Sequence, residues 1–142
     1  MKIRDTVAEA VLTNKSDAIV AADAEGVISF WNPGAERIFG YTSAEAIGRS
    51  LDIIIPERQR KRHWDGYARV VEGEKSRYGD ADVLSVPGIR KDGTSVSLEF
   101  AIAPLQGEGR RLAGMVAIMR DVTKRFDEMR TLKKLVAANA KP

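Results

Sequence analysis

The chain has 142 residues, enough to bury the core of one domain, and 44% of them are hydrophobic against 30% charged, the balance of an ordinary globular protein. A net charge of only +3, from 23 basic and 20 acidic residues, argues against a chain dedicated to nucleic-acid binding. With no cysteine and a single histidine, disulfides, cysteine nucleophiles and multi-histidine metal sites are excluded.

The N-terminal part of the sequence predicts a helix followed by a β-hairpin. Ile3, Val7 and Val11 recur at helical spacing, so an amphipathic helix is expected over residues 3–13. The segments AIVAAD and VISFWN, separated by a short AEG turn, predict two antiparallel strands. The N-terminus has no apolar signal core and no apolar run approaches the roughly 20 residues needed to cross a bilayer, so we expect a cytoplasmic protein without a membrane partner.

Short helices are predicted next, because capping residues and glycines follow one another closely. Asn32 is placed to cap one helix that Gly40 ends, and Ser43 is placed to cap another that Gly48 ends. Pro56 opens a longer helix.

The longer helix, residues 58–73, has two distinct faces when its residues are placed at about 100° each. One face is charged and comprises Arg58, Lys61, Arg62, Asp65, Arg69 and Glu72. The other comprises Arg60, His63, Trp64, Tyr67, Val70 and Val71. Because acids and bases mix on the charged face, we interpret it as solvated surface rather than a phosphate-binding stripe. His63, on the apolar face, is either a half-buried histidine bonded to backbone or an axial ligand to a haem.

After Gly73, three β-rich stretches are separated by the turns KDGT and QGEG, and a final helix is expected to begin at Asp121 or Thr123. Apolar side chains alternate along the last two strands: Val96, Leu98, Phe100 and Ile102 on one, and Met115, Ala117 and Met119 on the other. An apolar sheet face under a helix is either a filled core or a ligand pocket. The element order favours one antiparallel sheet with helices packed on one face.

The sequence contains no catalytic constellation, so we expect no enzyme. It lacks GxxxxGK[ST] and GxGxxG loops, and no serine lies in a strand–turn–helix elbow. The paired carboxylates Asp80 and Asp82 fall in a probable loop, where carboxylates are usually solvated.

Over about residues 14–124 the chain resembles the PAS family of sensor domains. The resemblance rests on DAIVAADAEGVISFWNPGAERIFGYTSAEAIGRSLDIIIPE, RKDGTSVSLEFAIAPL and GMVAIMRDVT, in this order. It implies an α+β fold with a five-stranded antiparallel sheet of order 2-1-5-4-3, short helices around a pocket on one face, and flanking helices. The chain then divides into an N-terminal helix (1–14), a PAS domain (15–123) and an output helix (124–142).

The resemblance also implies a function and a set of site residues. Such a module binds a small ligand or cofactor, or mediates dimerisation, and relays a signal to a kinase, cyclase or regulator domain. The residues expected to contact the ligand are His63, Tyr67, Leu84, Leu98, Phe100, Ile102, Met115, Ala117 and Met119. Asp121 and Thr123, in the closing DVT segment, are expected to carry the signal.

The PAS subtype and the cofactor stay open. The light-sensing LOV subtype uses a flavin-contacting cysteine, which is absent, and Met119 matches its flavin-contacting glutamine. In haem-based oxygen sensors the ligating histidine follows the helix-opening proline by seven residues, as His63 follows Pro56. However, the step from His63 to Tyr67 is one residue longer than in those sensors, and the place of their oxygen-holding arginine falls near Leu84 or Asp82. A haem-based gas or redox sensor and a ligand-free interaction module are therefore the alternatives to a small-ligand sensor.

Apolar stripes in residues 3–12 and 126–136 lie outside the region that resembles the PAS core. Phe126, Met129, Leu132 and Val136 recur at 3-3-4 spacing, which suits packing against a partner helix. Because exposed apolar stripes need a cover, we expect a homodimer through the terminal helices.

Overall fold

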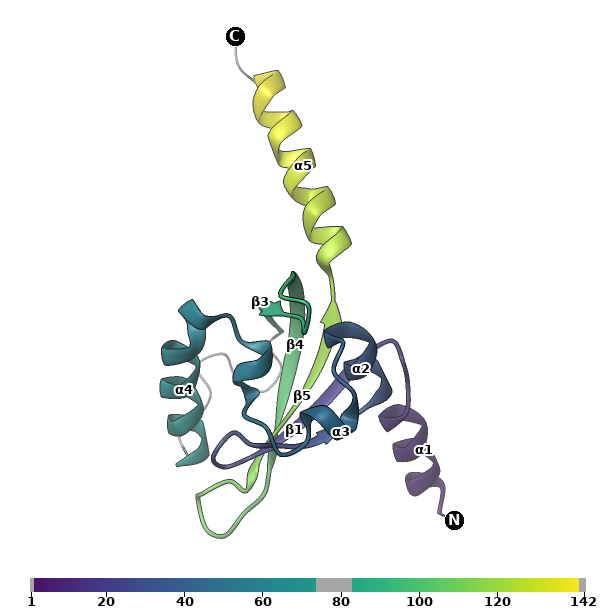
Figure 1. Cartoon of the computed structure of the whole chain (residues 1–142), viewed down its shortest axis with the longest axis vertical. Coiled ribbons are helices and arrows are strands. Elements are labelled where there is room, and N and C mark those ends of the chain that lie inside the picture. The colour runs from purple at the N-terminus through teal and green to yellow at the C-terminus, as the bar shows by residue number, and fades with distance from the viewer. Residues whose placement is uncertain (1, 74–82, 141–142) are drawn as a thin grey trace.

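The computed structural model describes residues 2–73 and 83–140, so Asp80 and Asp82 lie outside the described residues. Its centre is a five-stranded antiparallel sheet of order β2-β1-β5-β4-β3, which confirms the predicted order (Figure 1). The strands are β1 (Ala18–Asp23), β2 (Ile28–Trp31), β3 (Leu84–Ile89), β4 (Ser95–Leu105) and β5 (Gly114–Asp121).

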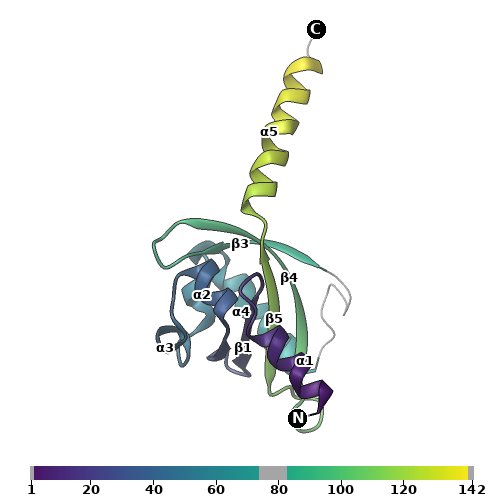
Figure 2. The ribbon, with the colours of Figure 1, turned by 90° about the vertical axis from the view of Figure 1, so that its right-hand side faces the viewer.

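The helices fall into an inner group and two terminal ones. The inner group, between β2 and β3, comprises α2 (Pro33–Phe39), α3 (Ser43–Ala46), the 3-10 helix η1 (Leu51–Ile54) and α4 (Glu57–Val71). The terminal helices are α1 (Ile3–Leu12) and α5 (Thr123–Ala140), and α5 projects from the end of β5 away from the rest of the chain (Figures 1 and 2). No helix in the described part of the chain is both long and apolar enough to cross a membrane.

Asn32 begins α2 as predicted and also joins the helix to the sheet. Its Oδ1 accepts hydrogen bonds from the Ala35 N–H at 2.9 Å and the Ile19 N–H at 2.8 Å, and its side chain is buried. Gly40 ends the helix in the left-handed region, at a φ of 84°, where glycine is favoured.

The capping residue predicted for α3 was wrong by one position. The cap is Thr42, whose hydroxyl accepts from the Glu45 N–H while the Glu45 carboxylate accepts from the Thr42 N–H. Ser43 is the first residue of the helix instead. The reciprocal pair requires a glutamate three residues after the cap, and only Thr42 has one.

The core lies on the face of the sheet that the inner helices cover. Met119 pairs with Ala18 on one side and Phe100 on the other, so these three side chains share that face. One cluster, with Phe39 and Trp31 among its buried members, lies under α2, α3 and η1. A second cluster is smaller and consists of Ala22, Tyr67, Val71 and Met115.

The two predicted faces of α4 are confirmed by burial. Every residue assigned to the charged face is exposed, and those on the other face are buried or half-buried. Because Tyr67 and Val71 enter the second core cluster, the C-terminal half of α4 is fixed to the sheet.

Candidate functional site

Trp64 and Tyr67 join α4 to η1 and to the turn between β1 and β2. The Trp64 indole N–H donates to Asp52 Oδ1 at 2.7 Å, and its ring lies over Gly26, where an added Cβ would come within 2.1 Å of it. The Tyr67 hydroxyl donates to the Asp23 carbonyl at 2.5 Å. Burial, with the nearby Asp23 and Glu25 carboxylates, raises the pKa of Tyr67 to about 12, so the phenol stays a donor.

His63 lies beside these two aromatic residues, with ring centroids 4.6 Å from Trp64 and 5.6 Å from Tyr67. Its Nδ1 is buried, and within residues 2–73 and 83–140 it has no hydrogen-bond partner. Burial lowers the pKa of His63, although the charge of Asp52 opposes this, so the imidazole is neutral near pH 7. The hydrogen bond to backbone that was expected of a half-buried His63 is not found at Nδ1 within the described residues.

A second unpartnered polar atom lies one helical turn before His63. Gln59 Oε1 is buried and, over the same described residues, also lacks a partner. Sequence reasoning missed Gln59, although the helical spacing that selects His63 places it on the same face. Buried polar atoms are normally paired, so two such atoms on one face of α4 mark a place suited to a polar ligand group.

The sheet supplies the apolar side of this site. All the predicted strand residues from Leu84 to Met119 lie on the face toward the inner helices, as their pairing register requires. Leu98, Met115 and Met119 are buried in the two core clusters. The residues that are only half-buried are Leu84, Phe100, Ile102 and Ala117.

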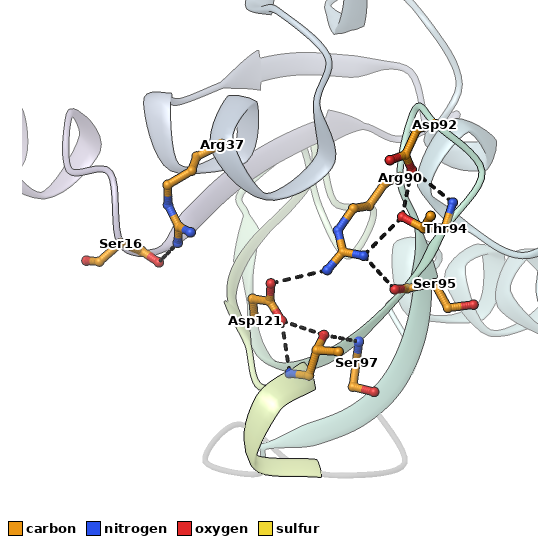
Figure 3. A network of polar contacts seen from close by, with 9 residues as sticks. Ser16, Arg37, Arg90, Asp92, Thr94, Ser95, Ser97 and Asp121 are labelled. Carbon is orange, nitrogen blue, oxygen red and sulfur yellow. Dashed lines mark hydrogen bonds and ion pairs between the residues drawn. The ribbon is translucent and has the colours of Figure 1, made fainter. Parts of the chain in front are cut away.

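The output junction joins the end of β5 to α5 (Figure 3). Asp121 Oδ1 accepts from the Thr123 N–H at 2.9 Å and the Thr123 hydroxyl at 2.6 Å, and its other oxygen lies 3.5 Å from Arg90 Nη2. The Thr123 hydroxyl in turn accepts from the Ser97 N–H at 2.9 Å. Burial acts to raise the pKa of Asp121, but the Thr123 hydrogen bonds and the Arg90 charge outweigh it, so this pKa lies below its ordinary value.

The turn between β3 and β4 connects this junction to the inner helices. Lys91, next to Arg90, pairs with Glu45 of α3, and its N–H donates to the Phe39 carbonyl of α2 at 2.8 Å. The Lys91 ammonium lowers the pKa of Glu45 to about 2. One turn therefore contacts both the α2–α3 region and the base of the output helix.

The family model described as PAS fold matches residues 12–126. The chain belongs to the PAS family. The crystal structure of a PAS domain from Colwellia psychrerythraea aligns with a TM-score of 0.71 at 27% identity, over 87% of this chain and 99% of that chain.

The relatives of this PAS domain include sensors. It is 30% identical to sensor protein FixL of Bradyrhizobium diazoefficiens, over 95% of this chain and 26% of FixL. It is 29% identical to oxygen sensor protein DosP of Escherichia coli, over 91% of this chain and 15% of DosP. The chain thus spans about a quarter or less of these two proteins.

The donor set of this PAS domain limits which metal groups it suits. No group of three or more His, Cys, Asp or Glu side chains in the described ranges is arranged to hold a metal ion. His63, as a neutral imidazole, has the donor chemistry for one axial bond to a haem iron.

Proposed function

We propose that this PAS domain is a sensory module, without catalytic activity of its own, that binds a small, largely apolar molecule between α4 and the sheet. The observation that carries the proposal is a pair of buried atoms, Gln59 Oε1 and His63 Nδ1, that find no hydrogen-bond partner in the part of the chain that the structure describes. Leaving such an atom unpaired costs about 1–3 kcal/mol, which a ligand with a hydroxyl or amide group recovers on binding. The half-buried Phe100, Ile102 and Ala117 supply the apolar contact.

The route from this site to the output helix runs along β5. Met119 lies on the core face, and Asp121, two residues further along the same strand, fixes the start of α5. A shift of β5 or of the β3–β4 turn on ligand binding therefore changes the angle of α5. The sensor relatives are several times longer than this chain, which supports a kinase, cyclase or regulator domain as the receiver of the signal.

Native mass spectrometry of the purified chain tests the proposal. We expect a bound small molecule that is lost in the variants Gln59→Met and His63→Leu and retained in Lys61→Met, on the exposed face of α4. A chain that carries nothing, and whose fused output is unchanged in both site variants, would instead be a ligand-free interaction module.

A haem-based gas or redox sensor is the second candidate, because His63 is a neutral imidazole and DosP is an oxygen sensor. In this case His63 would hold the haem iron, and the bound haem would supply the chemistry for binding a gas or accepting an electron. Titration with hemin distinguishes this candidate: it predicts a stoichiometric Soret band that His63→Ala abolishes. Leu84 is apolar and Asp82 lies outside the described residues, so no arginine is identified to hold oxygen.

Dimerisation through the terminal helices completes the proposal. Ile3, Val7 and Val11 of α1 are 78%, 53% and 53% exposed, and α5 has no buried residue. Light scattering at tens of micromolar should give a dimeric mass that decreases when residues 1–13 are deleted.

A further inference from the structure

Two polar atoms on α4 lie close enough for one ligand group to reach both. Gln59 and His63 are four residues apart on the same face of the helix, and side chains at this spacing are neighbours, with Cβ atoms about 5–6 Å apart. Gln59 Oε1 and His63 Nδ1 are both buried, and neither finds a hydrogen-bond partner in residues 2–73 and 83–140. A single small polar group between the two side chains can therefore satisfy both atoms.

The residues next to these two fix the first half of α4. The Trp64 indole donates to the Asp52 side chain. The Arg60 guanidinium donates from Nε to the Ile55 carbonyl at 3.1 Å and from Nη2 to the Asp52 carbonyl at 3.3 Å. All of these acceptors lie in η1 or directly after it. Because the backbone of Gln59 is held in this way, a ligand loses little of its binding energy in ordering the site.

The charges around the two atoms argue against a charged ligand. Arg60, the basic residue on this face of α4, is already bonded to backbone carbonyls. An anion would therefore be buried beside the Gln59 oxygen and near the Asp52 carboxylate, whose charge reaches His63. A cation is disfavoured as well, because burial lowers the pKa of His63 in spite of Asp52. An uncharged group that donates a hydrogen bond suits Gln59 Oε1 best.

Tyr67 sets the level of these atoms along the sheet, because it packs with Met115 near the start of β5. Figure 1 shows α4 and β4 running in roughly the same direction. A helix rises about 5.4 Å per turn and two strand residues span about 6.8 Å. His63 and Gln59, one and two turns before Tyr67, therefore lie at the level of the middle of β4, which includes Phe100.

The sheet at this level has apolar side chains that the described residues cover incompletely. Val86 of β3 pairs with the buried Leu98 and so shares its core face, yet Val86 is 40% exposed. Leu84 of the same strand pairs with Phe100, and both are only half-buried. The strip of Leu84, Val86 and Phe100 therefore offers apolar surface to the part of a ligand that does not reach the polar atoms of α4.

We propose that the site between α4 and the β3–β4 part of the sheet takes an uncharged molecule with a hydroxyl group on an apolar body. The hydroxyl donates its proton to Gln59 Oε1 and accepts a hydrogen bond from Nδ1–H of His63, while the apolar body lies against Phe100 and toward Leu84 and Val86. This rests on the ligand site proposed above and adds the chemical class and the orientation of its ligand.

Isothermal titration calorimetry on the full chain, refolded from urea to remove any bound molecule, tests the ligand class. The probes are para-alkylphenols and straight-chain alkanols. Each is matched with its methyl ether, which keeps the oxygen but has no proton to donate, and with a carboxylate of the same length. We expect at least one series to bind about ten- to hundredfold more tightly than its ethers, because an ether leaves Gln59 Oε1 unpaired. The carboxylates should bind no more tightly than the ethers. The series that binds shows whether the apolar body is aromatic or aliphatic.

Substitutions on α4 assign the preference to the two atoms. In Gln59→Met and in His63→Leu, the preference for hydroxyl over ether should fall to about threefold or less. Lys61→Met, on the exposed face of the helix, should leave it unchanged.

Three results would each overturn the inference and leave the proposed ligand site standing. They are hydroxyl probes that bind no more tightly than their ethers, carboxylates that bind most tightly, and a hydroxyl preference that survives Gln59→Met. A water molecule that already pairs with both atoms predicts the first of these. If, in addition, no probe binds, the purified chain carries no molecule and the fused output is unchanged in both site variants, the proposed function fails as well.

Discussion

His63 folds as a neutral imidazole because burial lowers its pKa more than Asp52 raises it. Between this lowered pKa and the ordinary value of about 6.5 the unfolded chain binds more protons, so the free energy of unfolding rises with pH. We therefore expect the urea midpoint to decrease as the pH is lowered from about 7.5 to about 5.5. The slope should disappear in His63→Phe. A slope that persists in the variant would have to come from another group, although the chain has no second histidine.

Gln59 offers a second test at the scale of one side chain. Gln59→Met keeps the length of the side chain and removes the buried, unpartnered oxygen, so the ligand-free protein should gain about 1 kcal/mol in free energy of unfolding. The same substitution at Gln106, which is exposed between β4 and β5, serves as the control and should change stability little. If Gln59→Met destabilises the ligand-free chain, the oxygen has a partner in solution and no longer argues for a ligand.

At the junction between β5 and α5, two substitutions of Asp121 separate its hydrogen bonds to Thr123 from its ion pair with Arg90. Asp121→Ala removes the acceptor for Thr123 and should lower the free energy of unfolding by about 1 kcal/mol. Asp121→Asn keeps an acceptor for Thr123 but loses the charge that faces Arg90. We expect Asn to restore most of the stability and little of the output in a fused reporter. If Asn restores both, the Arg90 pair has no part in signalling.

The output junction loses stability at a lower pH than His63 does. Because the pKa of Asp121 is lowered in the folded state, its contribution is fully present above the ordinary carboxyl pKa. It is lost as the pH falls through the lowered value. The two groups therefore act in separate pH windows, and His63 can be measured near neutrality without interference from Asp121.

Local chemistry made most elements predictable from sequence. Asn32 begins α2 and Gly40 ends it, as expected, since both signals act within a few residues of the helix. The cap of α3 was misplaced, although Thr42 with Glu45 carries the stronger signal. The pairing of Lys91 with Glu45 had no local signal, because a turn and a helix 46 residues apart meet only through the tertiary fold.

At the scale of the whole molecule, the sheet order followed from the family resemblance and the shared face of the site followed from strand alternation. Periodicity could not tell a filled core from a ligand site, because both need the same apolar residues. Two individual atoms favour the proposed ligand site: among the described residues, Nδ1 of His63 and Oε1 of Gln59 are buried without partners, whereas Leu98 and Met119 are buried in the apolar core. The hydrogen-bond partners of the α4 side chains come from other elements, such as Asp52 of η1 and Asp23 of β1. The helical spacing of α4 alone therefore could not predict which of its polar atoms stay unpaired.

The chain should behave as a folded domain with a separable dimerisation helix. Since α5 has no buried residue, a chain ending at Asp127 should unfold at nearly the same temperature as dilute full-length protein. The full chain should differ in one respect: its melting temperature should rise with protein concentration, because dimerisation stabilises the folded state by mass action. The shortened chain should show no such rise. Circular dichroism at several concentrations measures both. A shortened chain that melts far below the dilute full-length protein would mean that α5 stabilises its own domain rather than a partner copy.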